Sequence, residues 1–330
     1  MGPQLHVYQS LWAMEFRQPG IPELSLEECF RRIHAAGFNG IAIDLGATDI
    51  ETAKRCAGLL VEYQLGCMIN AFPRSVEDLR AVFDLSNYLG AKVVNVIGQQ
   101  MPVALPECIK IVELWMREAE TAGVELLFET HRNSLLNDLY YILQIMDSVP
   151  HMKICADLSH ILVDREFRYP ISPEADQMID SVLRRSKSFQ GRIATREQIQ
   201  IPIGFPHHRK WIELFRTWWE RGFRYWLETA TPTDTLIFLC ELGPPDYAIT
   251  GPDGRELSDR WQEALMLMIL AVIGPGDEII VPEPNYNTYH DALKFARGVK
   301  VSVPSNADTN FRTSPDDVRA AITPRTRALL

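Results

Sequence analysis

The sequence predicts an α/β protein in which eight strand–helix units close into a (β/α)8 barrel, followed by a shorter α/β fragment. Short apolar runs alternate with longer amphipathic segments over about the first 270 of the 330 residues, which is the size expected of such a barrel. A doubly wound open sheet is the alternative. It seldom needs eight consecutive units, and no glycine-rich phosphate-binding motif follows the first apolar run.

Eight short runs have the composition of strands that are buried on both faces. Strands of a parallel barrel are covered by helices outside and by packed side chains inside, so they are apolar along most of their length. The runs 124–128 and 236–240 show this most clearly. The expected strands are 4–10, 39–44, 66–70, 91–96, 124–129, 152–157, 189–193 and 236–241.

Amphipathic segments between these runs predict the helices. Ser25 and Ser75 each precede a segment with an acidic residue at the third helical position, as is typical of a helix N-cap. Gly37, Gly90 and Gly123 follow predicted helix ends, where a left-handed residue is favoured. The expected helices lie near 26–37, 49–64, 75–89, 106–122, 134–148, 174–187 and 207–221.

Three of the predicted strands end abruptly in a carboxylate. Glu129 lies in Phe-Glu-Thr-His, Asp157 in Ala-Asp-Leu-Ser-His and Glu241 in Cys-Glu-Leu-Gly-Pro-Pro. A buried acid is costly unless it is paired or binds a cation. Because barrel active sites lie at the carboxyl ends of the strands, the three acids should share one site. A carboxylate-held metal ion is the simplest arrangement that uses all three, and a ring of helix-capping or salt-bridged acids is the alternative.

Other polar residues near strand ends could line the same mouth, but each is interpreted first as a packing or loop residue. The pair His207-His208 follows Pro206 and is interpreted as the cap region of a helix. The remaining residues of this kind are Gln9, Trp12, Asp44, Asn70 and Asn95.

With these motifs, residues 1 to about 265 resemble the xylose isomerase-like TIM barrels of the sugar phosphate isomerase/epimerase superfamily, which include endonuclease IV and the ketose 3-epimerases. The resemblance covers four strand ends and the start of the last helix. It is carried by Phe128-Glu129-Thr130-His131, Asp157-Leu158-Ser159-His160, Gly191-Arg192 with Gln198-Ile199-Gln200, Glu241-Leu242-Gly243-Pro244-Pro245 and Leu257-Ser258-Asp259-Arg260-Trp261.

The resemblance implies a divalent metal ion held by residues of strands five to eight. Its ligands would be Glu129, Asp157 and Glu241, with Gln190 where the family's His-x-Arg motif has histidine. A glutamine oxygen is a weaker and harder donor than imidazole, which favours Mn or Mg over Zn or Co, or an empty site. An offset alignment would place Ala194 or Gln198 at this position instead.

The resemblance also implies roles in catalysis and substrate binding. Glu129 and Glu241 would exchange a proton with the substrate, while His131, His160 and Arg192 would bind its oxygens. Each of the last three residues has a simpler reading: His131 as a loop histidine, His160 as a group that orients Asp157, and Arg192 as a counter-charge for the acids.

The segment from about residue 262 onward resembles the large domain of class I and II aminotransferases. The resemblance lies in Gly274-Pro275-Gly276-Asp277-Glu278 with Pro282-Glu283-Pro284-Asn285-Tyr286, and in Thr323-Pro324-Arg325-Thr326-Arg327. Expected elements are strands at 278–282, 299–303 and 326–330 and helices at 286–296 and 315–322. The predicted domains are a barrel over 1–265 and a partial aminotransferase-like segment over 266–330, which must pack on the barrel, dimerise or stay partly disordered.

The aminotransferase-like segment stops before the family's cofactor-binding lysine. Lys294 and Lys300 lie at the wrong positions to form an aldimine with pyridoxal phosphate (PLP). We therefore expect no PLP and no transaminase activity from this segment.

Composition narrows the location and the partners. A net charge of −10 argues against nucleic acid, and the longest apolar run, 265–273, is too short to span a membrane. Six scattered cysteines indicate free thiols in a reducing compartment, so the expected location is the cytoplasm. The expected partner is a small-molecule substrate. The sequence does not decide whether the chain forms a homo-oligomer.

The leading hypothesis is a metal-dependent isomerase or epimerase that acts on a small sugar or α-hydroxycarbonyl compound. The alternatives are a vestigial, non-catalytic barrel and a metal-dependent lyase or hydrolase of the same superfamily. A remnant PLP aminotransferase is disfavoured.

Overall fold

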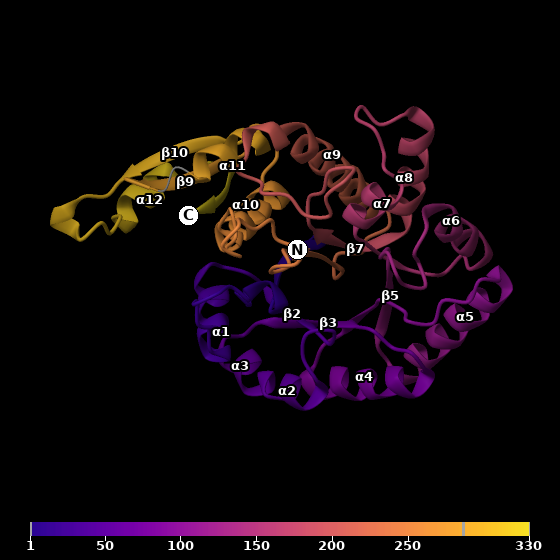
Figure 1. Cartoon of the computed structure of the whole chain (residues 1–330). Helices are drawn as coiled ribbons and strands as arrows, with labels where there is room; N and C mark the ends of the chain where they lie inside the picture. The colour runs from indigo at the N-terminus through magenta and orange to yellow at the C-terminus, as the bar shows by residue number, and fades with distance from the viewer. Residues whose placement is uncertain (1, 286–287, 330) are drawn as a thin grey trace.

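The computed structural model describes residues 2–285 and 288–329, and its main part is a closed barrel of eight parallel strands surrounded by helices (Figure 1). Each strand pairs with the next, and β1 pairs with β8 to close the barrel. The strands are β1 Gln4–Ser10, β2 Gly40–Asp44, β3 Gly66–Ala71, β4 Val93–Val96, β5 Glu125–Glu129, β6 Ile154–Ala156, β7 Ser186–Gly191 and β8 Thr235–Cys240. The predicted (β/α)8 TIM barrel is confirmed.

The helices lie outside the strands and bury one apolar face against them. They are α1 Leu26–Ala35, α2 Ile50–Lys54, α3 Cys56–Glu62, α4 Val76–Leu89, α5 Leu105–Ala122, α6 Leu139–Ser148, α7 Leu158–Asp164, α8 Pro173–Arg185, α9 Arg209–Leu227 and α10 Arg260–Val272. Ser25 and Ser75 cap α1 and α4 as predicted, each accepting a hydrogen bond from a backbone N–H. Gly90 and Gly123 end α4 and α5 with a left-handed backbone.

Three of the described elements differ clearly from the predicted ones. The predicted helix 49–64 is split at Arg55 into α2 and α3, and α7, which directly follows Asp157, was not predicted. Strand β7 starts at Ser186 rather than at 189. Its early residues are polar but satisfied, because the hydroxyls of Ser186 and Ser188 donate to the carbonyls of Val182 and Ile237.

The C-terminal residues form a three-stranded parallel sheet in the order β10-β9-β11. The elements are β9 Glu278–Glu283, α11 Thr288–Ala296, β10 Val299–Pro304, α12 Pro315–Ala321 and β11 Thr326–Leu329. They match the predicted elements, apart from residues 286, 287 and 330, which lie outside the described residues.

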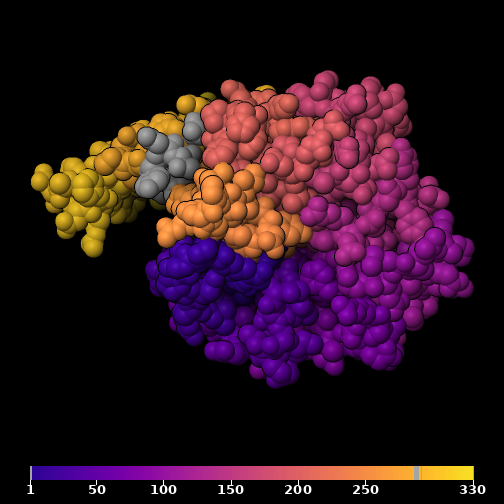
Figure 2. All heavy atoms as spheres, viewed as in Figure 1, coloured from indigo at the N-terminus to yellow at the C-terminus, as the bar shows by residue number. Residues whose placement is uncertain are grey.

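This segment packs on the barrel through helices, and its far end extends away from the rounded body (Figure 2). Helix α10 contacts β1 and β8 on one side and α11 on the other. Ile279 and Leu293 belong to the same buried apolar cluster as Ile273 at the end of α10. Helix α10 therefore runs across the predicted boundary at 265/266, and the two-domain division stays a prediction.

All six cysteines are buried free thiols. None of the helices described over 2–285 and 288–329 combines the length and the hydropathy that crossing a lipid bilayer requires.

Candidate active site

The three strand-ending acids meet at the carboxyl-terminal mouth of the barrel. Glu129 ends β5, Asp157 directly follows β6 and Glu241 directly follows β8. One carboxylate oxygen from each lies within 4.8 Å of the others, and the residues are only 2%, 0% and 4% exposed. Side chains alternate along a strand, so each acid faces inward two residues beyond the packed barrel interior at Leu127, Cys155 and Leu239.

Arg192 lies between two of these acids. Its Nη1 donates to Oδ2 of Asp157 at 2.7 Å, and its Nη2 donates to Oε2 of Glu241 at 3.0 Å. Its Nε donates to the backbone carbonyl of Glu241 at 3.0 Å. The guanidinium therefore acts as a counter-charge inside the site, which is one of the two readings that the sequence left open.

Amide side chains connect Glu129 to Glu241. Asn95 Nδ2 donates to Glu129 Oε2 and, at 3.0 Å, to Asn70 Oδ1. Asn70 Nδ2 in turn donates to Glu241 Oε1 at 2.8 Å. The sequence favours a packing or loop role for both asparagines, whereas the structure places them in the candidate site. The signal for their position is that each lies late in a strand, on the inward face, in register with its neighbour.

Gln190 is buried beside Glu129 and has one free polar atom. Its Nε2 donates to Glu129 Oε2 at 3.0 Å, while its Oε1 is buried without a hydrogen-bond partner. An unpartnered buried carbonyl oxygen is costly, and a cation is one ligand that would satisfy it. The donor set of this site is thus rich in oxygen, as Mg or Mn prefers.

The buried carboxylates of the site carry more negative charge than Arg192 can neutralise. Burial, followed by the negative charge of Asp157, raises the pKa of Glu129 to about 8. Burial also raises the pKa of Asp157 and of Glu241, although Arg192 opposes both shifts. Three carboxylates face one guanidinium, so two further positive charges would neutralise the group. A divalent cation or two bound protons would supply them.

The two predicted substrate-binding histidines lie against each other with their rings tilted by 40°. The rings of His131 and His160 have centroids 3.8 Å apart, and His160 Nε2 lies 3.2 Å from Arg192 Nη1. His131 Nδ1 lies 2.5 Å from the carbonyl of Arg132, which leaves Nε2 for another partner. Burial lowers the pKa of both, that of His131 to about 4, so both are neutral at pH 7. Together with Glu129 they form a second group whose ligand atoms lie within 4.8 Å of one another.

A cavity of about 270 Å³ opens above the acids. Trp12 and Tyr247 form one wall as an edge-to-face pair with centroids 5.2 Å apart. A Cβ atom at Gly243 would lie 2.5 Å from Trp12 and 2.8 Å from Tyr247, so only glycine fits beneath this pair. The lining residues are Trp12, Arg17, Asp44, Gly46, Ala47, Phe72, Ile97, Glu129, His131, Arg192, Glu241 and Tyr247.

Asp44 lines this cavity, whereas the sequence favours a packing or loop role for it. Its Oδ1 accepts a hydrogen bond from the backbone of Gly46 at 2.7 Å, and burial raises its pKa to about 6. His208 instead bonds to the carbonyl of Pro202, and neither His207 nor His208 is among the residues that line the cavity. This agrees with the reading of that pair as a cap region.

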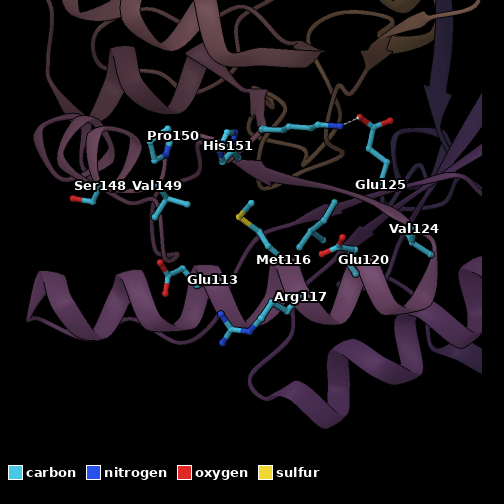
Figure 3. A pocket seen from close by; sticks show the side chains of 13 residues that line it. Glu113, Met116, Arg117, Glu120, Val124, Glu125, Ser148, Val149, Pro150 and His151 are labelled. Carbon is cyan, nitrogen blue, oxygen red and sulfur yellow. Dashed lines mark hydrogen bonds and ion pairs between the residues drawn. The ribbon is translucent and has the colours of Figure 1, made fainter.

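A larger hollow of about 520 Å³ lies at the opposite, amino-terminal end of the strands (Figure 3). It lies between α5 and α6, and Lys153 there donates to Glu125 at 2.7 Å. The side chains of this ion pair are 48% and 42% exposed, and neither metal-type cluster of the described residues lies here. Size alone therefore does not identify the site, and the cluster of buried acids lies at the smaller cavity.

Comparison with known proteins supports the two-part description of the chain. Residues 30–190 match the family model of the xylose isomerase-like TIM barrel, and residues 262–330 match that of class I and II aminotransferases. Both resemblances are thereby confirmed.

Among solved structures, the chain is similar to D-allulose 3-epimerase from Methylomonas sp. in complex with D-allulose. The match has 13% identity and a TM-score of 0.53, and it covers 81% of this chain and 96% of the epimerase. A likeness at this level of identity establishes the fold.

The curated relatives match the C-terminal segment. The aspartate/prephenate aminotransferase of Thermus thermophilus is 42% identical over 69 residues, which are 21% of this chain and 18% of that enzyme. The same enzyme of Nitrosomonas europaea is 38% identical over 71 residues, again 18% of its length. The chain thus spans less than a fifth of the length of these two relatives.

Proposed function

We propose that the barrel is a metal-dependent isomerase or epimerase that acts on a small sugar or α-hydroxycarbonyl compound. The observation that carries the proposal is the convergence of Glu129, Asp157 and Glu241, with a shortfall of positive charge, beneath a cavity at the catalytic end of the barrel. The similarity to a ketose 3-epimerase supports this class of substrate.

The residues that would hold the metal ion are Glu129, Asp157, Glu241 and Gln190, the last through its unpartnered Oε1. A bound divalent cation would supply electrophilic stabilisation of the negative charge that develops on the substrate oxygens. The oxygen-rich donor set favours Mn or Mg.

Proton transfer is assigned to Glu129 and Glu241. They come from strands on different sides of the barrel, and one can remove the proton next to a carbonyl while the other returns it. Glu129 is oriented by the amides of Asn95 and Gln190, and Glu241 by Asn70 and Arg192. His131 offers a neutral Nε2 to a substrate hydroxyl.

The test is solvent deuterium exchange in the presence of Mn²⁺ or Mg²⁺, with D-allulose, D-fructose and smaller ketoses as substrates. We expect deuterium at the carbon next to the carbonyl. Glu129→Gln and Glu241→Gln should each lower the exchange rate by a factor of about 10² to 10⁴, because each removes a general acid–base group. The matched control is Glu125→Gln at the exposed start of the same strand as Glu129. Near-normal exchange in either site variant would refute the assignment.

A second candidate function is a vestigial barrel, and Arg192 gives it a specific basis. Its guanidinium already bonds to Asp157 and Glu241, so part of the charge that a metal ion would supply is present. Metal analysis of purified protein distinguishes the two. Less than about a tenth of an equivalent of bound cation, with no stimulation by Mn, Mg or Co, favours the vestigial barrel.

A further inference from the structure

A separate small cavity lies between helices α9 and α10, which are neighbours in Figure 1. It has a volume of about 140 Å³ and shares no lining residue with the cavity above the acids. One wall is the last turn of α10 with the residues that follow it, over 270–275. The other wall comes from α9 and consists of Arg216, Trp219, Glu220 and Phe223. These residues are spaced by three and four positions, so they lie on one face of their helix.

Arg216 is almost completely buried without a hydrogen-bond partner. The residue is 8% exposed, and its Nε is a buried atom with no acceptor. Its one ion pair among the described residues joins Nη1 to Oε2 of Glu220 at 3.9 Å, beyond hydrogen-bonding distance. The other oxygen of Glu220 accepts a hydrogen bond from Arg224 at 2.5 Å. A guanidinium consists only of donors, so its burial without an acceptor is costly.

Trp219 supplies a second unpartnered donor on the same face of α9. The residue is 1% exposed, and its indole Nε1 is buried without a hydrogen-bond partner. Its ring packs edge-to-face against Phe238 of β8, with centroids 5.0 Å apart, which holds it in place. Buried N–H groups are normally paired. Two unpartnered donors beside one cavity therefore indicate a missing acceptor, and the charge of Arg216 favours a carboxylate.

The opposite wall of the cavity has the reverse polarity. Helix α10 ends at Val272, and the last carbonyl groups of a helix have no amide partner within it. The next amides do not compensate, because the N–H of Gly274 donates to the side chain of Asp277 at 3.0 Å and Pro275 has no N–H. The negative end of the helix dipole therefore lies at this wall, where it favours an ammonium group or another hydrogen-bond donor.

The size of the cavity limits the ligand. A cavity of about 150 Å³ accommodates a molecule the size of benzene, so only a compact ligand fits here. The lining includes the apolar residues Phe223, Leu270 and Ile273. A short carbon chain that carries a carboxylate, with a donor on the neighbouring carbon atom, matches the donors of α9, the end of α10 and the apolar lining together.

We propose that this cavity is a binding site for a small amino or hydroxy acid, which is bound there and not transformed. Its carboxylate accepts hydrogen bonds from Arg216 and Trp219, and its amino or hydroxyl group faces the end of α10. Gly274 and Pro275 lead from α10 into the C-terminal segment, so the bound acid connects that segment to α9. The site is separate from the reaction cavity, so its ligand is not the substrate of the barrel.

The test measures the binding of small probes to the whole chain by isothermal titration calorimetry. L-Alanine and L-lactate carry both polar groups, propionate lacks the donor, and ethylamine lacks the carboxylate. We expect L-alanine or L-lactate to bind saturably and about tenfold more tightly than propionate and ethylamine, because each of these lacks one polar contact. The tighter of the two acids identifies the donor as ammonium or hydroxyl. L-Tryptophan is too large for the cavity and should not bind.

Variants locate the bound acid. Arg216→Met replaces the guanidinium by an apolar side chain and should abolish binding. Because Arg216 has no hydrogen bond to lose, this variant should keep or raise the urea midpoint of the ligand-free protein, which an arginine that supports the fold would not allow. Ala271→Leu, on the partly exposed last turn of α10, fills the cavity and should abolish binding by a second route. The matched control is Arg224→Met on the exposed side of α9, which should leave the affinity unchanged.

The inference is overturned if neither L-alanine nor L-lactate binds saturably, if propionate or ethylamine binds as tightly as they do, or if either cavity variant keeps the affinity of the wild type. Glu129→Gln should leave the binding of these probes unchanged. A loss of binding in that variant would place the probes in the reaction cavity and would also overturn the inference.

Discussion

Arg192 determines the charge balance of the candidate site. The residue is 2% exposed and bonds to two of the three buried carboxylates. Removing one partner of a buried ion pair leaves an uncompensated charge, which costs far more than the loss of an exposed pair.

We therefore predict that Arg192→Gln lowers the free energy of unfolding by about 3–5 kcal/mol in the presence of EDTA. Mn²⁺ should restore part of this loss, because a divalent cation can neutralise the same acids. Urea denaturation with and without the metal ion measures both effects.

Arg184→Gln is the control, since its partnership with Asp180 on the surface of α8 is worth about 0–1 kcal/mol. Equal effects of the two substitutions would show that the ion pairs of Arg192 do not support the fold.

At the scale of elements, Glu263 connects helix α10 to the loop that follows β7. Its Oε1 accepts a hydrogen bond from the backbone N–H of Ile203 at 2.8 Å, and the residue is 5% exposed. Burial raises the pKa of Glu263 to about 7, against an ordinary value of 4.5. The loop over 201–204 leads from the site-bearing strand β7 towards α9, so this bond helps to hold the mouth of the barrel in place.

This shift predicts a pH dependence of stability. Below pH 4.5 the carboxyl of Glu263 is protonated in both states, and its titration then costs the fold no stability. Between about pH 4.5 and 7 the unfolded chain releases the proton that the folded chain keeps, so stability falls as the pH rises. The total loss is on the order of 3 kcal/mol.

Glu263→Gln removes this titration and keeps an acceptor for Ile203. The free energy of unfolding of the variant should therefore rise relative to wild type between pH 5 and 8, as measured by urea denaturation at several pH values. Comparing the two proteins cancels the contribution of the other buried acids. A difference that does not change with pH would contradict the assigned shift.

The pairing of neighbouring strands also decides which amide side chains reach the buried acids. Glu129, Asp157 and Glu241 could be predicted as site residues because each interrupts an apolar run. Asn70 and Asn95 have no such signal, since an asparagine near a strand end is also common in turns. Their place in the candidate site becomes visible only when the register of β3 and β4 puts them side by side, between Glu129 and Glu241.

For the whole molecule, the main feature is that α10 packs against both the barrel and the C-terminal segment. The helix buries Leu267 and Leu270 in the main apolar cluster, and that cluster continues into Ile279 and Leu293 of the segment. Burial of apolar surface between them stabilises the attachment by about 25 cal/mol per Å².

We predict that a chain ending at Ile273 exposes the face of α10 that now packs against α11. Such a chain should bind the dye ANS more strongly and self-associate, as measured by fluorescence and size-exclusion chromatography, because large apolar patches promote association. The full-length chain is the reference. A truncated chain that is monomeric and binds no more dye would show that the segment contributes nothing to covering this face.

Taken by itself, the sequence determined most of the strands and helices and the three strands that end in acids, and it showed a resemblance to one family before about residue 262 and to another after it. These features depend on local composition and on short motifs, which can be recognised from residues that are neighbours in the sequence. The start of β7 and the presence of α7 were missed because polar residues there are satisfied by partners far away or by the following turn.

Only the tertiary structure decided how the acids are compensated and what borders them. Arg192 meets Asp157 and Glu241 across 35 and 49 residues, and Arg132 meets Tyr247 from another loop of the mouth. Such contacts arise from the closure of the barrel, which brings strand ends together irrespective of their distance along the chain. The physical reason is that charge balance and cavity shape depend on many residues from distant parts of the sequence. A motif contains information only about residues that are adjacent in the sequence.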